Sequence, residues 1–495
     1  MVETDKNNRY ILNTFELPNK NCYNNYISNT LKEIELELNN NLIKLMYENS
    51  PPYITKKLTS DGKSKYDPFI YTGTSGNIYV YWRYYIYKSY NYIDSDKSKS
   101  DTNKSSLKYF EKAVDTNINL VNNMFKSNDN NLSPSFYLGL PGIFALSSVY
   151  YYEIYLLKHK DISFLNKSLY YVKKIIDFKT NCFADNNQEE LLYGYPGYLW
   201  TLLFVSYNVI FKIEDDNIVK EIKNVLFTNI IELFEFIIKE GLKNKDYYNL
   251  PCMAYIFPKN KYNINNLDKC NFYTGAAHGI LGNMLVLIET LRFFKIFDKL
   301  SIVFNLTNYH IYEKIIIEDL LYLASIQFDT GNFPSSLGKE KDLLLHWCHG
   351  STGAIIVYCK AFEIFSKIDI RNKYNFNICD FFLDSAVKAG NDLWNRGILL
   401  KGNGICHGIS GNAYAFNSLY KATNNKDWYI KFLAFVSFTY KKSIISKCIN
   451  YEDKSRKVKG IADSPFSLME GLGGLVTLYS DILSNNVLFP GFELL

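Results

Sequence analysis

The chain has 495 residues, of which 47% are hydrophobic and 16% are aromatic, and its 55 basic and 50 acidic residues leave a net charge of +5. This much apolar side chain is enough for a large packed core, which excludes global disorder. The near balance of charge, with six arginines in the whole chain, excludes the basic face of a nucleic-acid-binding protein.

Localisation can be predicted from features at the N-terminus and from the cysteines. The first residues lack the apolar stretch of a secretory signal, and no run of about eighteen uncharged apolar residues is long enough to span a membrane. The nine cysteines are odd in number and irregular in spacing, which favours a reducing compartment over a disulfide framework. We therefore expect a cytoplasmic protein without a transmembrane segment.

A repeat dominates the chain after an N-terminal extension. Residues 1–66 precede the repeat and are predicted to include an outer helix near residues 27–46, and the polar, low-complexity residues 92–106 are predicted to be a loop. Two glycines spaced three apart then occur seven times, each pair followed by an apolar, aromatic-rich run. The pairs are Gly73/Gly76, Gly139/Gly142, Gly194/Gly197, Gly279/Gly282, Gly350/Gly353, Gly408/Gly411 and Gly471/Gly474. Such self-similarity is typical of a repeat architecture.

Each repeat is predicted to contain two helices that meet at the glycines. The segments after the glycines, such as 283–294 and 354–365, are apolar on almost every face, a pattern typical of a buried helix. The segments before them, such as 222–237, are amphipathic, with Lys and Glu between the apolar positions. Seven such pairs predict an all-α fold, an α/α toroid of fourteen helices in an inner and an outer layer, and a single domain over residues 1–495.

The rare reactive side chains stand at fixed offsets from the glycines. His278, His349 and His407 directly precede the first glycine of consecutive repeats, and Cys348 and Cys406 stand one position earlier. Repeats five and six are neighbours in a closed ring, so Cys348 and Cys406 are expected to lie close together with His407 beside them. Two thiolates and one imidazole are a suitable set for zinc, and such a three-ligand site keeps a fourth position open in catalytic centres. We therefore predict a zinc site formed by these three residues.

The spacing leaves the roles of the other histidines open. His278 could be a fourth metal ligand or a general acid or base beside the metal. His349 could also bind the metal, but it is adjacent to Cys348, and only one of the two side chains is expected to point inward. His346 is expected to make a supporting hydrogen bond.

Several longer motifs extend these patterns. They are Glu190-Leu-Leu-Tyr-Gly194, Gly275-Ala-Ala-His278-Gly279, Gly331-Asn332-Phe333-Pro334, Leu345-His346-Trp347-Cys348-His349-Gly350, Lys401-Gly402-Asn403-Gly404-Ile405-Cys406-His407-Gly408, Pro465-Phe466-Ser467-Leu468-Met469-Glu470-Gly471 and Phe489-Pro490-Gly491-Phe492-Glu493-Leu494. Together they resemble the LanC-like proteins, the eukaryotic relatives of bacterial lanthionine cyclases, over essentially the whole chain. The resemblance implies the α/α toroid and zinc held by Cys348, Cys406 and His407.

The resemblance also implies roles for four further residues. His278 falls on a histidine proposed as an acid or base, and Glu190 falls on an acidic residue discussed for the bacterial cyclases. Eukaryotic members bind glutathione at the zinc, and two of the residues that contact it match Lys401 and Arg9. These four residues are therefore expected to line the site.

The chain departs from the family pattern at one glutathione-contacting position. The second arginine of the family aligns with Gly460, and Arg456, Lys457 and Lys459 are the nearest basic residues. A lysine does not replace the bidentate contact of an arginine, so the sequence does not reveal which residue, if any, takes over this contact.

The function implied by the resemblance is zinc-dependent addition of glutathione to dehydroalanine or dehydrobutyrine residues of proteins, which arise when phosphate is eliminated from phosphoserine or phosphothreonine. Coordination to zinc makes a thiol a thiolate at neutral pH, and His278 suits the protonation of the enolate that forms. One alternative is a non-catalytic scaffold or sensor that binds zinc and glutathione through the same residues. Protein prenyltransferase β subunits are also α/α toroids with a zinc-bound thiol, but they hold the zinc by Asp, Cys and His at a different spacing.

Overall fold

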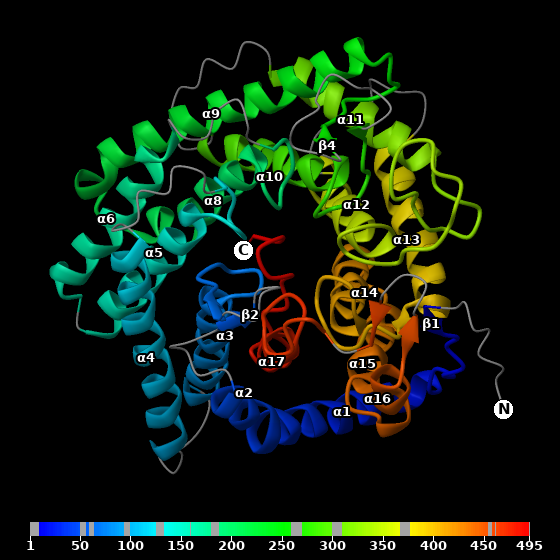
Figure 1. Cartoon of the computed structure of the whole chain (residues 1–495), viewed down its shortest axis with the longest axis horizontal. Coiled ribbons are helices and arrows are strands. Elements are labelled where there is room, and N and C mark those ends of the chain that lie inside the picture. The colour runs from blue at the N-terminus through cyan, green and yellow to red at the C-terminus, as the bar shows by residue number, and fades with distance from the viewer. Residues whose placement is uncertain are drawn as a thin grey trace.

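The computed structural model of the protein describes residues 9–49, 56–58, 64–93, 100–124, 133–158, 160–179, 188–258, 270–298, 309–366, 377–453, 458–460 and 462–494. In these residues the helices form a ring with an inner and an outer layer (Figure 1). The α/α toroid predicted from the glycine repeat is therefore confirmed.

The inner layer follows directly from the glycine pairs, because an inner helix begins one residue after the first glycine of every pair. These helices are α3 (Thr74–Ile93), α5 (Leu140–Leu157), α8 (Tyr195–Asn208), α10 (Ile280–Asp298), α12 (Ser351–Phe365), α14 (Ile409–Thr423) and α17 (Leu472–Leu483). The second glycine of a pair lies against the chain that precedes the helix. A Cβ atom on Gly142 would lie 1.8 Å from the carbonyl oxygen of Phe136, and one on Gly411 would lie 1.8 Å from that of Ile405, so a larger residue does not fit.

The outer layer is built from amphipathic helices whose apolar faces pack on the inner ones. They are α4 (Ser100–Met124), α6 (Ile162–Asp177), α9 (Asp216–Tyr247), α11 (Tyr309–Ser325), α13 (Ile378–Arg396) and α15 (Lys426–Phe438). The N-terminal helices α1 (Tyr23–Glu37) and α2 (Ile43–Asn49), joined by the π-helical turn η2 (Leu38–Leu42), pack against α17. The predicted N-terminal extension thus supplies the outer partner of the last inner helix.

The prediction of a loop over residues 92–106 was wrong at both ends. Helix α3 continues to Ile93 and α4 begins at Ser100, so residues 94–99, which lie outside the described residues, are all that separates the two helices. The polar residues at the start of α4 are compatible with a helix because the amphipathic segment that follows propagates it, and Ser, Asp and Lys have only a small helix-propensity cost.

Short elements complete the described structure. Four antiparallel two-stranded ladders pair β1 (Tyr10–Ile11) with β6 (Ile398–Leu399), β2 (Lys56–Leu58) with β3 (Ser64–Tyr66), β4 (Phe257–Pro258) with β5 (Cys270–Asn271), and β7 (Glu452–Asp453) with β8 (Val458–Lys459). The remaining helices are η1 (Lys20–Cys22), η4 (Ile210–Lys212) and α16 (Lys442–Ile449). None of the helices described is both long and apolar enough to cross a membrane.

The loops that precede the inner helices bond to one another around the ring. Backbone N–H groups donate to carbonyl oxygens of the next repeat in five places: Tyr71 to Tyr137, Leu192 to Ala277, Trp347 to Cys406, Cys406 to Met469, and Met469 to Tyr71. The last of these bonds joins repeat seven to repeat one, and α17 also packs on α3. The residues that stand just before the glycines are therefore gathered at one end of the ring.

The C-terminal segment lies inside the ring (Figure 1). The rings of Phe489 and Phe492 lie 5.1 and 5.4 Å from the buried indole of Trp347, and Tyr137 donates a hydrogen bond to the carbonyl oxygen of Pro490. Aromatic packing of this kind supports the loop that carries Trp347.

Candidate metal centre

The loops before α12 and α14 bring two thiols and one imidazole together. The ligand atoms of Cys348, Cys406 and His407 all lie within 4.8 Å of one another, and among the described residues no other group of this kind stands out. Both cysteines are buried and the histidine is half-buried. This donor set suits zinc, and three protein ligands leave a fourth position for an outside ligand.

The electrostatics of the two thiols also fit a metal. Burial raises the pKa of the Cys406 thiol well above its ordinary value, nearby Cys348 raises it further, and His407 lowers it. Two buried thiolates therefore need a compensating positive charge, which a divalent cation bound by the same atoms supplies.

Backbone bonds fix the loops that carry the ligands. The N–H of Trp347 donates to the carbonyl oxygen of Cys406 at 3.1 Å, and the N–H of Cys406 donates to Met469 at 2.8 Å. Gly350 has a φ of +104°, and an added Cβ would lie 1.9 Å from the carbonyl oxygen of Leu344. Only glycine fits where the chain turns from the Cys348 loop into α12.

His278 lies beside this cluster and is held by Glu190. Its Nδ1 atom lies 3.0 and 3.1 Å from the two carboxylate oxygens of Glu190, which is buried in the loop before α8. Burial alone would lower the pKa of His278, but the hydrogen bond and charge of Glu190 outweigh it and raise the pKa above its ordinary value. Burial in turn raises the pKa of Glu190, and His278 opposes that effect.

His278 is not among the three clustered ligands, whereas its ring lies among aromatic side chains. It stacks 5.4 Å from His349 and lies 5.9 Å from Tyr193 and 5.6 Å from Phe257. Burial, together with the charge of His278, lowers the pKa of His349 to about 3. His349 therefore faces His278, while its neighbour Cys348 faces the thiol cluster.

His346 lies on the other side of the cluster. Its Nδ1 atom is 3.9 Å from the sulfur of Cys348, and its ring is 5.9 Å from that of His407. Burial lowers the pKa of His346 well below its ordinary value, and the charges of His407, Lys401 and Arg9 act in the same direction. Lys401 and Arg9 are thus close enough to this edge of the cluster to lower the pKa of His346.

Strand pairing explains why Arg9 and Lys401 lie together, although they are far apart in the sequence. Strand β1 pairs with β6 so that Tyr10 lies opposite Leu399, and the N–H of Leu400 donates to the carbonyl oxygen of Arg9 at 2.9 Å. Lys401 follows directly and begins the loop that leads to Cys406.

Gly460 lies against the same strand pair. A Cβ atom there would lie 1.6 Å from the carbonyl oxygen of Cys448 and 2.7 Å from that of Leu400. A side chain at this position would therefore overlap the backbone of both residues. Lys459 is exposed, and Arg456 and Lys457 lie outside the described residues.

Sequence reasoning missed the aromatic residues around the cluster. Tyr71 stands two residues before Gly73, the offset that Cys348 and Cys406 have in their repeats, so the repeat itself contained this signal. Burial raises the pKa of the Tyr71 hydroxyl well above its ordinary value, and Cys406 and Cys348 raise it further. Tyr193 directly precedes Gly194, the offset that His278 has from Gly279, so the repeat contained this signal as well. Phe257 and Tyr273 carry no comparable signal, because only the fold brings them to His278.

The half-buried side chain of Glu189 holds the segment that ends in Phe257. Glu189 accepts hydrogen bonds from the backbone N–H of Ile256 and from the side chain of Asn244, both at 2.8 Å. Burial raises the pKa of Glu189 to about 7, and these hydrogen bonds oppose the shift. The wall of aromatic side chains beside His278 thus depends on a carboxylate adjacent to Glu190.

Comparisons with known proteins agree with this arrangement. The family model of lanthionine synthetase C-like proteins matches residues 64–494. The chain is 29% identical over 365 residues to the glutathione S-transferase LANCL1 of Danio rerio, covering 72% of this chain and 74% of that protein. It is 31% identical over 224 residues to the LanC-like protein GCL1 of Arabidopsis thaliana, covering 45% and 43%.

Among solved structures, a nisin cyclase has the same fold, with a TM-score of 0.57 and 16% sequence identity over 90% of this chain and 94% of that one. The family match spans all seven glycine repeats and the loops that carry the cluster. The chain belongs to the lanthionine synthetase C-like protein family.

Proposed function

We propose that the protein is a zinc-dependent enzyme that adds glutathione to dehydroalanine or dehydrobutyrine residues of proteins or peptides. The observation that carries the proposal is the convergence of Cys348, Cys406 and His407 beside a histidine bonded to a carboxylate. The family and the relative named a glutathione S-transferase support a reaction at sulfur.

The binding half of the proposal assigns three metal ligands and two cations. Zinc held by Cys348, Cys406 and His407 would keep the sulfur of glutathione as a thiolate at neutral pH. Arg9 and Lys401, which the β1–β6 pair brings to this edge of the cluster, bind carboxylates of glutathione. Gly460 contributes no side chain to this contact.

The chemical half assigns His278 and Glu190. The sulfur of glutathione forms a bond to the β-carbon of the dehydro residue, and the electron pair of the double bond moves onto the α-carbon and its carbonyl as an enolate. Protonated His278 then delivers a proton to the α-carbon, while Glu190 holds the ring and stabilises its charged form. The proton released when the thiol ionises passes to solvent, and solvent restores the proton on His278, so the net reaction adds one thiol across one double bond.

We also propose that residues 1–495 form a single domain that acts in the cytoplasm. The bond from Met469 to Tyr71 and the packing of α1 and α2 on α17 support the single domain. Six of the cysteines that the structure describes have free thiols, which favours a reducing compartment: Cys22, Cys252, Cys348, Cys359, Cys406 and Cys448.

The test is incubation of the zinc-loaded protein with glutathione and a dehydroalanine peptide, followed by mass spectrometry. The expected product is the peptide plus one glutathione, formed faster than without protein and at background rates with Cys406→Ala. Zinc and glutathione binding with no product above background would favour the scaffold or sensor instead.

A further inference from the structure

One buried amide closes the neck of the loop that carries Cys348. The side chain of Asn332, which is fully buried, donates from Nδ2 to the carbonyl oxygen of Leu344 at 2.9 Å. Its Oδ1 atom accepts from the backbone N–H of Ser351 at 2.9 Å and from the hydroxyl of the same residue at 2.7 Å. The side chain of Asn332 therefore ties Leu344 to Ser351, with Cys348 between them, and the hydroxyl of Thr352 adds a longer bond to the carbonyl oxygen of Leu345 at 3.3 Å.

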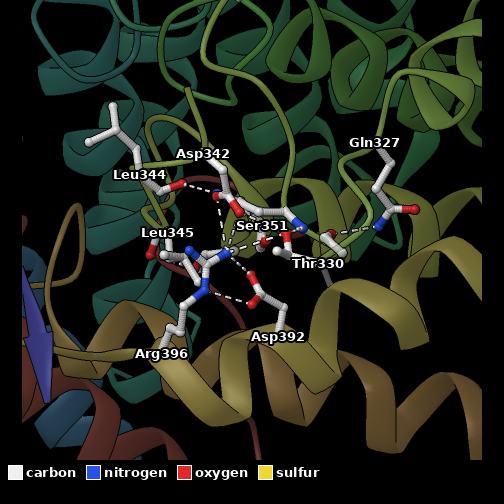
Figure 2. A network of polar contacts seen from close by, with 11 residues as sticks. Gln327, Thr330, Asp342, Leu344, Leu345, Ser351, Asp392 and Arg396 are labelled. Carbon is white, nitrogen blue, oxygen red and sulfur yellow. Dashed lines mark hydrogen bonds and ion pairs between the residues drawn. The ribbon is translucent and has the colours of Figure 1, made fainter. Parts of the chain in front are cut away.

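A second layer of charged groups holds this amide in place (Figure 2). Asp342 accepts from Nδ2 of Asn332 at 2.7 Å and from Nη2 of Arg396 at 2.8 and 3.0 Å. Arg396, the last residue of α13, is fixed by Asp392, which accepts from its Nε and Nη2 at 2.7 and 2.6 Å. All four side chains are mostly buried, so their bonds are shielded from water.

The two cysteines of the cluster are held differently. Cys406 is fixed by its own backbone, because its N–H donates to Met469 and its carbonyl oxygen accepts from Trp347. Cys348 lies in an eight-residue loop, residues 344–351, which the backbone bonds of His346 to His349 and of Trp347 to Cys406 hold in the middle and which Asn332 restrains at its ends. Groups that bind a metal must be held to within about 0.5 Å of the productive geometry, so the restraint at the neck matters for the position of the sulfur.

We propose that Asn332 is a positioning residue of the metal centre: its amide fixes the loop of Cys348, and Asp342 and Arg396 hold that amide. The inference rests on the metal ligands of the proposed function. Asn332 acts through the loop and touches none of the three ligands. Residues that hydrogen-bond a metal ligand directly typically contribute 10–100-fold to metal affinity, and we expect the restraint of the ligand loop to act on the same scale.

Gln327 provides a matched control. It is an amide in the same region, and its Nε2 donates to the carbonyl oxygens of Gly331 at 2.6 Å and Ser385 at 3.0 Å. It ties the turn that contains Gly331 to α13 but makes no bond to residues 344–351. Asn332→Ala and Gln327→Ala each remove an amide with backbone partners, and only the first opens the neck of the loop.

The experiment titrates the metal-free full chain with Co²⁺ and measures both the affinity and the thiolate-to-cobalt absorption in the near ultraviolet. We expect Asn332→Ala to weaken Co²⁺ binding by about 10–100-fold and to reduce the absorption per bound Co²⁺. The Co²⁺ affinity of Gln327→Ala is expected to stay within about threefold of the wild-type affinity, which is the variation expected of a substitution that leaves the loop intact. Asp342→Ala, which removes the acceptor that orients the amide, is expected to fall between them, and it carries the test if Asn332→Ala does not fold.

Two results would overturn the inference. One is a Co²⁺ affinity and a thiolate-to-cobalt absorption in Asn332→Ala that equal those of the wild type. If Asn332→Ala does not fold, the same result in Asp342→Ala would overturn the inference. The other is an equal loss in Asn332→Ala and Gln327→Ala, which would reduce the effect to general stability. If the wild type itself binds no Co²⁺, the proposed metal centre is wrong. If the wild type binds Co²⁺ but the variants behave as described above, only the role of Asn332 is wrong.

Discussion

The backbone N–H of Trp347 donates to the carbonyl oxygen of Cys406, so the loops that carry the two candidate thiol ligands are joined directly. These loops are also packed between inner helices whose side chains are almost all buried. The geometry of the cluster is therefore a property of the closed ring, and we expect the ring to keep it when the proposed metal is removed. Small zinc domains, by contrast, unfold without metal.

The first prediction concerns the metal content. We expect about one zinc per chain, with sulfur ligands at roughly 2.3 Å and nitrogen at roughly 2.0–2.1 Å, measured by elemental analysis and X-ray absorption. Cys348→Ala/Cys406→Ala should lose the zinc yet keep its helical circular dichroism, because buried apolar surface holds the ring. Full zinc in the double variant would show that the metal is bound elsewhere.

The second prediction concerns Lys401. Removing its charge by Lys401→Ala should weaken glutathione binding by about 1–2 kcal/mol, the range for a hydrogen bond to a charged group, while zinc content stays unchanged. Calorimetric titration of the zinc-loaded protein measures both affinities. Lys442→Ala, at an exposed position of α16, is the matched control and should bind glutathione like the wild type. Equal affinities of the two variants would remove Lys401 from the binding site.

The third prediction concerns Gly460, the position at which the resemblance to the LanC-like family leads us to expect an arginine. Gly460→Arg is expected to lower the thermal midpoint and to leave glutathione affinity no better than in the wild type, because the Cβ atom would overlap the carbonyl oxygens of Cys448 and Leu400. Gly338→Arg serves as the control for added charge, since a Cβ there meets nothing within 4 Å, although its φ of +73° carries some strain. Tighter glutathione binding in Gly460→Arg would mean that this strand can shift to accept a side chain.

The ring could be predicted from the sequence because its signal repeats. The glycine pairs predicted where every inner helix begins, and the common offset of Cys348 and Cys406, with His407 next to the latter, then implied that the three meet. Tyr71 follows the same offset and was overlooked only because a tyrosine is not a usual metal ligand.

Contacts between segments without periodicity could not be predicted in this way. Nothing in the sequence reveals that β1 pairs with β6, or that the amide of Asn332 bonds to both Leu344 and Ser351. Such contacts depend on the final packing of loops, which local pattern does not encode. The start of α4 at Ser100 was also missed, because the polar composition of this stretch predicted a loop. Composition alone does not show how far a neighbouring helix propagates.

The fourth prediction concerns the pH dependence of stability. Burial raises the pKa of Glu189 to about 7, so the folded protein holds a proton that the unfolded chain releases near pH 4.5. Stability should therefore fall as the pH rises from about 4.5 to about 7, and the carboxylate then costs on the order of 1–3 kcal/mol above pH 7. Asp319, with a pKa also raised to about 7 by burial, acts in the same direction.

Glu189→Gln tests this dependence. The amide oxygen can still accept from Ile256, but the group no longer titrates, so the variant should melt higher than the wild type at pH 8 and about equally at pH 5. Glu221→Gln, at an exposed position of α9, should follow the wild type at both values. A lower midpoint of Glu189→Gln at pH 8 would mean that the ionised carboxylate stabilises the fold, which is the opposite of the expected sign.

The last prediction concerns His278 and its partner. His278→Asn should retain zinc and glutathione, whereas thioether formation on a dehydroalanine peptide should fall by about 10²–10⁴-fold, the usual contribution of a positioned general acid.

Because Glu190 raises the pKa of His278, the acid form persists to higher pH than in a free imidazole. Turnover that depends on this acid is present below the folded pKa and is lost as the pH rises through it. Glu190→Gln removes the charge that raises the pKa, so the falling limb of the pH profile should move to lower pH. Loss of zinc in His278→Asn would instead identify it as a metal ligand, and an unmoved falling limb in Glu190→Gln would show that another group delivers the proton.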